Sequence, residues 1–217
     1  MICATMHFFP GGTLLKSYDL VHWEIAAHVF ERLDDTPAEQ LEGEQSIYGK
    51  GMWAASLRYH KDTFYVCFAS YDTGKTYIYR TKNINEPWEK RSLDGVYHHP
   101  SLLFDEDGRI YMGYGFNEVR ILELNDTLTA PKEGGFERLL VEEKQDAYIS
   151  YEGAHFYKKD GTYYIFVIQW LKGNLTQREQ LCLYGDSLDG EFKKEMVFSE
   201  NLGFPMKGVA QLSLIHI

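Results

Sequence analysis

Basic residues are scarce in this sequence. It has 22 Lys and Arg against 32 Asp and Glu, which gives a formal net charge of −10. The basic residues stand singly or in pairs, whereas binding to nucleic-acid phosphates needs them clustered. We therefore expect no nucleic-acid partner.

Cysteines and long apolar runs are also few. Cys3, Cys67 and Cys182 are an odd number at wide spacing, which indicates neither a disulfide framework nor a metal site. Cys67 and Cys182 lie in apolar runs, so we expect them to be buried. No run approaches the roughly 18 apolar residues of a membrane span, so no membrane partner is expected. No signal peptide is visible at Met1, although the start looks truncated, so a secreted or periplasmic location stays open.

Helical periodicity is nearly missing. The best helical turn is Ala38–Gln45, which we interpret as a loop. Aromatic residues, in contrast, reach 15%, with 16 Tyr. That content fits a β-rich core, and it equally fits a sugar-binding cleft.

Three segments repeat one pattern of a short apolar strand, a polar turn and an aromatic strand. They are ASLRYHKDTFYVCFA (55–69), PSLLFDEDGRIYMGY (100–114) and GAHFYKKDGTYYIFV (153–167). The Asp-Gly pairs at 107–108 and 160–161 are strong hairpin signals. A further strand follows each hairpin, as TYIYRT (76–81), VRILEL (119–124) and QLCLYG (180–185).

One repeat unit therefore has about four strands in 45–55 residues, the period of a propeller blade. A four-stranded sheet cannot bury both faces alone, so blades stack around an axis. An open β-sandwich would give no reason for the repeat. The pattern predicts an all-β propeller in which the first blade begins in mid-sheet, three blades are whole and a fifth starts at Gly208–Gln211. We interpret residues 1–211 as an incomplete propeller domain and residues 212–217 (LSLIHI) as a non-native tail.

Five pieces of the chain together resemble glycoside hydrolase family 43. They are FFPGGTLLKSYDLVHWE, GMWAASLRYHKDTFYVCFASYDTGKTYIYRT, HHPSLLFDEDGRIYMGYG, YEGAHFYKKDGTYYIF and KGVAQ, in the family's order and spacing. The resemblance implies a five-bladed β-propeller, here a fragment of about four blades. It also implies a β-xylosidase or α-L-arabinofuranosidase that cleaves plant oligosaccharides or polysaccharides with inversion. Xylose and arabinose both stay open as the sugar.

The family's chemistry assigns roles to two positions. An inverting glycosidase uses a general acid and a general base separated by roughly 6.5–9.5 Å, which leaves room for the attacking water. Glu152, in YEGAH, matches the family's acid; a lone Glu beside Gly is otherwise a solvated turn residue. His99 occupies the position of the family's third carboxylate, an Asp that raises the pKa of the acid. The family's base would precede Met1, so we expect this chain to be weakly active or inactive.

The resemblance also suggests residues that bind sugar. Phe9, Trp53, His98 and Trp170 are the candidates, and for the aromatic rings among them packing in the core is the competing interpretation. No cofactor is expected, and no metal is assigned because the family's axial cation is held from the fifth blade.

Two classes of function follow. The first is a glycosidase, favoured by the resemblance and by Glu152 beside Tyr151 and before His155. The second is a non-catalytic propeller that binds carbohydrate or protein, favoured by His99 and by the missing base. Fold alone does not separate them, because propellers serve both purposes.

Overall fold

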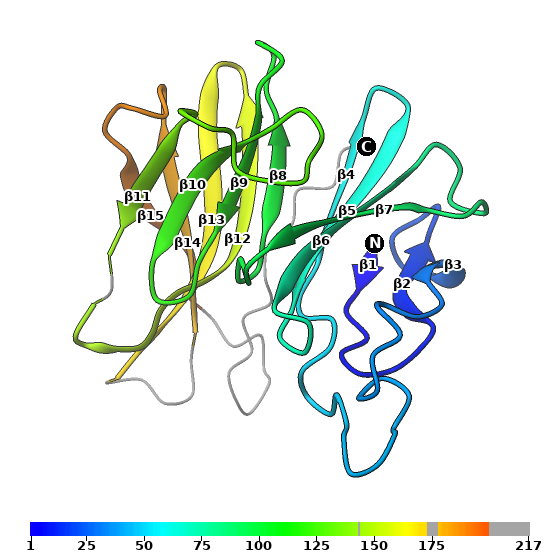
Figure 1. Cartoon of the computed structure of the whole chain (residues 1–217). Coiled ribbons are helices and arrows are strands. Elements are labelled where there is room, and N and C mark those ends of the chain that lie inside the picture. The colour runs from blue at the N-terminus through cyan, green and yellow to red at the C-terminus, as the bar shows by residue number, and fades with distance from the viewer. Residues whose placement is uncertain (143, 173–177, 200–217) are drawn as a thin grey trace. The chain divides into compact units, whose positions relative to one another are not determined.

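The computed structural model describes residues 1–142, 144–172 and 178–199, and in these segments the chain forms antiparallel strands and no helix (Figure 1). Accordingly, none of the described segments is a helix of the length and apolarity that a membrane crossing needs. The chain divides into two compact units. The first contains Met1–His98 and Thr127–Ala130, and the second contains His99–Asp126 and the described residues from Pro131 onward.

The first unit contains two sheets. One has the order β1-β2-β3 and the other the order β4-β5-β6-β7. Their strands are β1 (Ile2–Cys3), β2 (Gly11–Lys16), β3 (Glu24–Phe30), β4 (Ser56–His60), β5 (Thr63–Ser70), β6 (Lys75–Thr81) and β7 (Glu89–Asp94). The first sheet has three strands, whereas each of the other three sheets has four.

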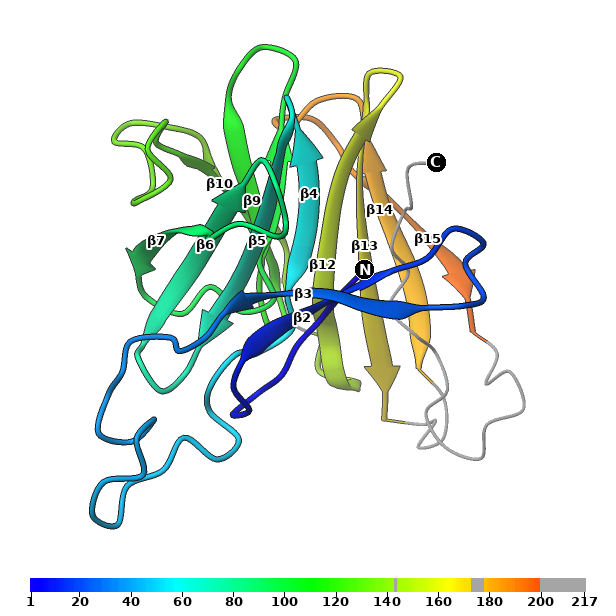
Figure 2. The same cartoon turned by 90° about the vertical axis from the view of Figure 1, so that its right-hand side faces the viewer.

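The second unit contains two sheets of four strands each, with the orders β8-β9-β10-β11 and β12-β13-β14-β15. Figure 2 shows β12 to β14 side by side. The strands are β8 (Ser101–Phe104), β9 (Ile110–Tyr114), β10 (Val119–Leu124), β11 (Glu137–Val141), β12 (Ala147–Lys159), β13 (Thr162–Leu171), β14 (Glu179–Gly185) and β15 (Lys193–Phe198). The expected strand at 208–211 and the tail 212–217 lie outside the described residues.

The repeated hairpins form where the sequence predicts them. The β12–β13 turn has φ of 51° at Asp160 and 83° at Gly161, and the β4–β5 turn has 46° at Lys61 and 58° at Asp62. Two successive positive φ angles are typical of the tight turns that match the twist of paired strands. In these two repeats the turn thus fixes which residues of the hairpin face each other.

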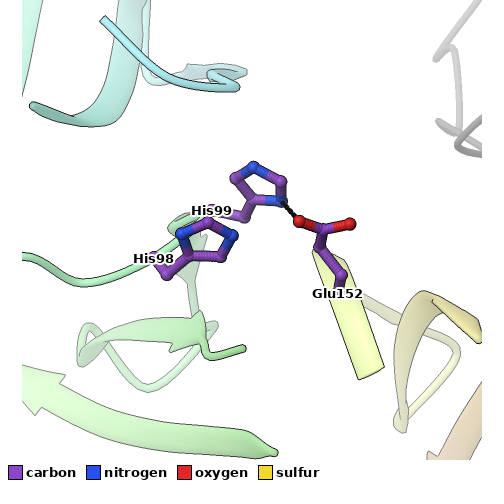
Figure 3. Close-up of side chains that lie close together, drawn as sticks. All are labelled: His98, His99 and Glu152. Atoms are coloured by element: carbon purple, nitrogen blue, oxygen red, sulfur yellow. Dashed lines mark ion pairs between the residues drawn. The ribbon is translucent and has the colours of Figure 1, made fainter. Parts of the chain in front are cut away.

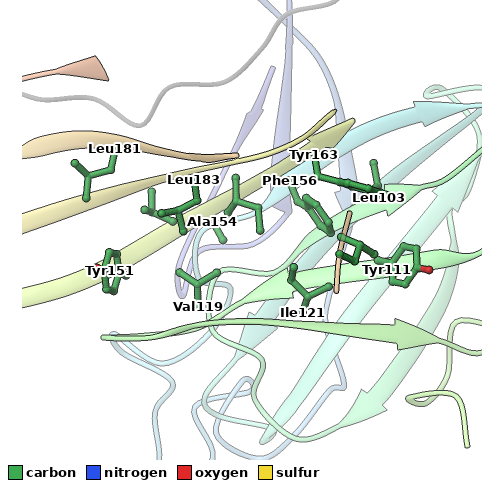
Figure 4. Packing of buried hydrophobic residues seen from close by; sticks show 13 residues of the cluster. Leu103, Tyr111, Val119, Ile121, Tyr151, Ala154, Phe156, Tyr163, Leu181 and Leu183 are labelled. Carbon is green, nitrogen blue, oxygen red and sulfur yellow. The ribbon is translucent and has the colours of Figure 1, made fainter. Parts of the chain in front are cut away.

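Each unit has its own apolar core between its two sheets. In the second unit, Val119 and Ile121 of β10 pack with Phe156 of β12 and Ile165 of β13, as Figure 4 shows for most of the cluster. In the first unit, Phe30 of β3 stacks on Phe68 and Tyr79 of the neighbouring sheet, with ring centroids 5.5 and 5.4 Å apart. Burial of these faces explains why a single blade is not stable alone.

A buried carboxylate also joins the two sheets of the second unit. Asp105 follows β8, and its carboxylate accepts hydrogen bonds from Lys158 Nζ at 2.6 Å and from the Tyr163 hydroxyl at 2.5 Å. Burial alone would raise the pKa of Asp105, but the bonds from Lys158 and Tyr163 outweigh it, so the pKa is lowered. The contact therefore stabilises the ionised carboxylate and ties β8 to β12 and β13.

Asp105→Asn is expected to lower the free energy of unfolding by about 2 kcal/mol at neutral pH, because it removes the nearer of the two carboxylates beside the Lys158 ammonium; the other, Glu106, is exposed and lies 3.9 Å away. Since the folded-state pKa of Asp105 lies below the unfolded value, its contribution is full above about pH 4 and is lost as the pH falls further. Urea titrations at pH 7 and pH 3 measure both effects, and the difference between the variant and the parent should shrink at pH 3. Glu106→Gln, at an 87% exposed side chain in the same turn, is the control and should change stability by less than about 0.5 kcal/mol. An equal loss in both variants would contradict the role of Asp105.

Candidate active site

Glu152 lies on β12 in a segment with an irregular register. It stands opposite Ile168 of β13, while Ile149 stands opposite Trp170 and His155 opposite Phe166. On each side of Glu152, an advance of three residues along β12 therefore matches an advance of two residues along β13, so the register shifts once before Glu152 and once after it. Bulges of this kind bend a strand, re-aim a side chain and are common beside active sites.

Asn117 binds the backbone of the bulged segment. Its side-chain oxygen accepts the N–H of Ser150 at 3.0 Å, and its own N–H donates to the carbonyl of Tyr151 at 2.8 Å. Asn117 has φ of 64°, a left-handed conformation that Asn adopts more readily than most residues. The loop between β9 and β10 thereby satisfies backbone groups that the bulges leave unpaired, directly before Glu152.

His99 reaches the same place from the start of β8. Two residues after it, the Ser101 hydroxyl oxygen accepts the backbone N–H of Phe156 at 3.0 Å. This bond joins the beginning of β8 to the part of β12 that follows Glu152. His99 has φ of 48°, and His, Asn and Asp are the non-glycine residues most often found in that region.

The two side chains meet within the second unit. His99 Nδ1 lies 3.9 Å from Glu152 Oε1, and the side chains are 10% and 14% exposed, respectively (Figure 3). A carboxyl group this far from water is favoured in its protonated, neutral form, whereas a protonated imidazole nearby favours the carboxylate. An imidazole and a carboxyl group therefore lie close enough to interact electrostatically.

Trp53 and His98 lie together in the first unit. The Trp53 ring centroid is 5.7 Å from that of His98 and 5.2 Å from that of Tyr71. The Tyr71 hydroxyl and His98 Nδ1 are 2.5 Å apart. Main-chain pairing of Met52 with Met6 and with Ser70 fixes Trp53 beside Tyr71. Two of the predicted sugar-binding residues, Trp53 and His98, thus lie close together in space.

The other two predicted binding residues have different surroundings. Phe9 is partly buried against the core of the first unit, with its ring 6.1 Å from Phe30 in an edge-on arrangement. Trp170 is partly exposed at the end of β13, with its ring 5.1 Å from that of Tyr148. Core packing, the competing interpretation for both, thus has direct support at Phe9.

The sequence interpretation missed Asn117, Tyr71 and Tyr148. Asn117 follows the Gly115-Phe116 pair at a hairpin turn, and a turn Asn with positive φ is a recognisable signal for a backbone contact. Tyr71 directly follows a predicted strand. No signal distinguishes Tyr148 from the other tyrosines, because its importance comes from the register between β12 and β13.

The chain resembles known glycosidases along most of its length. The family model described as glycosyl hydrolases family 43 matches residues 1–194. A β-xylosidase of Formosa agariphila is 27% identical over 100% of this chain and 40% of its own length. A non-reducing end α-L-arabinofuranosidase of Bacteroides ovatus is 33% identical over 76% of this chain and 31% of its own length. This chain thus spans two fifths or less of the length of these relatives.

Solved structures agree with the fold. A bifunctional GH43-CE protein of Bacteroides eggerthii matches with a TM-score of 0.85 and 36% identity, over 91% of this chain and 26% of its own. An engineered GH43 enzyme with endo-xylanase and exo-arabinofuranosidase activity matches with a TM-score of 0.77 and 26% identity, over 91% of this chain and 38% of its own. These matches confirm the predicted all-β propeller class, with the four described sheets as its blades.

Asn117→Ala is expected to lower the free energy of unfolding by about 1–3 kcal/mol, because the Ser150 N–H loses its acceptor inside the protein. Thermal and urea unfolding measure the loss. Asn117→Gly removes the same acceptor but has no difficulty with a positive φ, so it separates the hydrogen bond from the backbone conformation. If Asn117→Gly is as stable as the parent, the hydrogen bond to Ser150 does not hold the bulged segment.

Proposed function

Because the chain belongs to glycosyl hydrolases family 43, we propose that it cleaves xylosyl or arabinofuranosyl linkages of plant oligosaccharides or polysaccharides with inversion at the anomeric carbon. Glu152 is the general acid in this proposal. The observation that carries it is the position of Glu152, a carboxyl group 14% exposed on a bulged strand beside His99. The similarity of the chain to a β-xylosidase and to an α-L-arabinofuranosidase supports the sugar class.

The acid must hold a proton at the pH of the reaction and give it to the leaving oxygen. Low exposure favours the neutral form of Glu152, as it does for catalytic acids in general. His99 works against this when it is protonated, because an imidazolium 3.9 Å away attracts the carboxylate. The side chain at position 99 therefore sets how good a proton donor Glu152 is.

We assign no general base. In the described part of the second unit, the buried carboxylates are Asp105 and Glu123. Asp105 pairs with Lys158, and Glu123 pairs with Lys132. The base of an inverting reaction has to activate water, so a carboxylate bonded to an ammonium group is a poor candidate.

A non-catalytic, carbohydrate-binding propeller is the second candidate function. The observation that favours it is His99, which stands where the family pattern has a carboxylate. Under this alternative, Glu152 and the aromatic residues bind oligosaccharides, and the protein does not cleave them.

Glu152→Gln is expected to lower kcat/KM on xylo-oligosaccharides or arabino-oligosaccharides by about 10²–10⁴, the usual contribution of a general acid. Glycosyl azides are the matched substrates, because azide leaves as a stable anion without a proton. Their hydrolysis should change by less than about threefold, since the acid has no role in that step.

The measurement compares the two substrates for Glu152→Gln and for Glu137→Gln, a control at an exposed carboxylate of the same unit. The control should match the parent on both substrates. Equal losses on azide and oligosaccharide in Glu152→Gln would show a structural role, and no loss on either would exclude Glu152 as the acid.

His99→Asp is expected to raise turnover on substrates with poor leaving groups by at least about tenfold, because a carboxylate beside Glu152 favours its protonated form. Asp also tolerates the positive φ at position 99. Assays use the 217-residue chain and any longer polypeptide that carries it, with His99→Asn as the neutral control. Equal turnover of the Asp and Asn variants would show that negative charge at this position does not tune the acid.

A further inference from the structure

We propose that Tyr148, backed by Trp170 and Arg178, forms a sugar-stacking surface for the leaving-group side of the substrate. These three residues are called the Tyr148 ledge below. The inference rests on the proposed function, because it uses Glu152 as the acid, and it adds a binding residue and a direction for the substrate chain.

The ledge is a layered arrangement on the second unit. The rings of Tyr148 and Trp170 have centroids 5.1 Å apart at an angle of 48°, and the Arg178 guanidinium lies 5.6 Å from the Trp170 ring centroid. Trp170 thus contacts both an aromatic ring and a cation, which restrict its position. Tyr148 is 49% exposed and presents the more open ring. Tyr148 is therefore the residue that would contact the sugar, and Trp170 supports the Tyr148 ring.

The register of β12 and β13 sets the distance between the ledge and Glu152. Glu152 stands opposite Ile168, and Trp170 follows two residues later on β13. Residues two apart on a strand share a face and are separated by about 7 Å. Ile149, opposite Trp170, is the chain neighbour of Tyr148. The ledge consequently begins about one sugar residue away from the acid along the same pair of strands.

The chemistry of the acid gives the direction. Glu152 donates its proton to the oxygen of the bond that breaks, and that oxygen leaves with the departing sugar. Glu152 therefore lies beside the oxygen that the departing sugar keeps, and a ring next to Glu152 is placed to contact that sugar. A ring stacked on Tyr148 would use the apolar C–H face of a xylose or arabinose unit, while the N–H groups of Arg178 can donate to its hydroxyls.

Packing alone does not account for Tyr148. Tyr111 and Tyr163 of the same unit serve the core and are 0% and 7% exposed, whereas Tyr148 keeps half of its surface in water. An exposed ring that is already held against a second ring loses little conformational freedom when a ligand binds, which favours binding. The occupant we assign is the first or second sugar of the leaving chain.

The test separates the leaving chain from the rest of the substrate. Tyr148→Ala is compared with the parent on a glycosyl azide, which has no leaving sugar, and on xylotetraose or an arabinoxylan oligosaccharide, which has one. We expect kcat/KM on the oligosaccharide to fall about fivefold to twentyfold, in line with loss of one aromatic contact, and azide hydrolysis to stay within about twofold. Tyr148→Phe keeps the ring and should restore most of the oligosaccharide activity.

A matched control completes the kinetic test. Tyr59→Ala removes another exposed tyrosine, 60% exposed and paired with the Phe64 ring at 4.7 Å, and should leave both substrates unaffected. Equal losses on azide and oligosaccharide in Tyr148→Ala, or no loss on either, would overturn the ledge. So would a parent that forms dimers which Tyr148→Ala disrupts without a change in oligosaccharide kinetics, because that result would give the surface to a second copy of the chain.

Calorimetric titration with xylotetraose and with an arabino-oligosaccharide distinguishes failure of the ledge from failure of the proposed function. If the parent binds either sugar chain but hydrolyses neither oligosaccharide nor azide, the glycosidase function fails. A weaker affinity of Tyr148→Ala would still support the surface as a sugar site, although not as a leaving-group site. If the parent binds neither sugar chain, the ledge itself is wrong.

Discussion

The structure depends on one constraint: a sheet that is apolar on both faces must be covered on both. The sheet β12-β13-β14-β15 shows this clearly. Ile165 and Val167 of β13 face the core shared with β8 to β11, whereas Phe166, between them, packs with Tyr157 and Cys182 on the opposite face. A β-strand sends successive side chains to opposite faces, so a continuous apolar run creates two hydrophobic surfaces. Stacked sheets meet that demand on one face inside each unit.

Both units reinforce their stacked sheets with the same polar contact. In the first unit, Asp34 follows β3 and accepts bonds from Lys90 Nζ at 2.5 Å and from the Tyr77 hydroxyl at 2.7 Å, both on the next sheet. In the second unit, Asp105 follows β8 and binds Lys158 and Tyr163 in the same manner. Burial acts to raise the pKa of each Asp, but the bonds from its lysine and tyrosine prevail and lower it. The two units thus use the same residue types for this contact, but from strands that are not equivalent in the repeat.

The sequence predicted the elements well because their signals are local. Turn residues at 61–62 and 160–161 and the alternation within each hairpin define the strands without knowledge of the rest of the chain. The proximity of His99 to Glu152 agrees with the family resemblance, which implies that the residue at position 99 acts on the acid. What could not be predicted depends on register: the bulges around Glu152, their bonds to Asn117 and the contact of Tyr148 with Trp170. These features follow from the register of β12 and β13, in which three residues of β12 match two residues of β13 on each side of Glu152. No residue type in the sequence indicates that register.

The left-handed backbone at His99 has a consequence for how this position can evolve. Few side chains accept a φ of 48° without strain, and Asp, Asn and His are the non-glycine residues that do so most readily. The codons for Asp, Asn and His differ from one another by single bases. The backbone conformation thus filters mutations at residue 99 toward a small set of side chains that differ in charge. A lineage can exchange these residues by single-base changes, and with them the charge that faces Glu152.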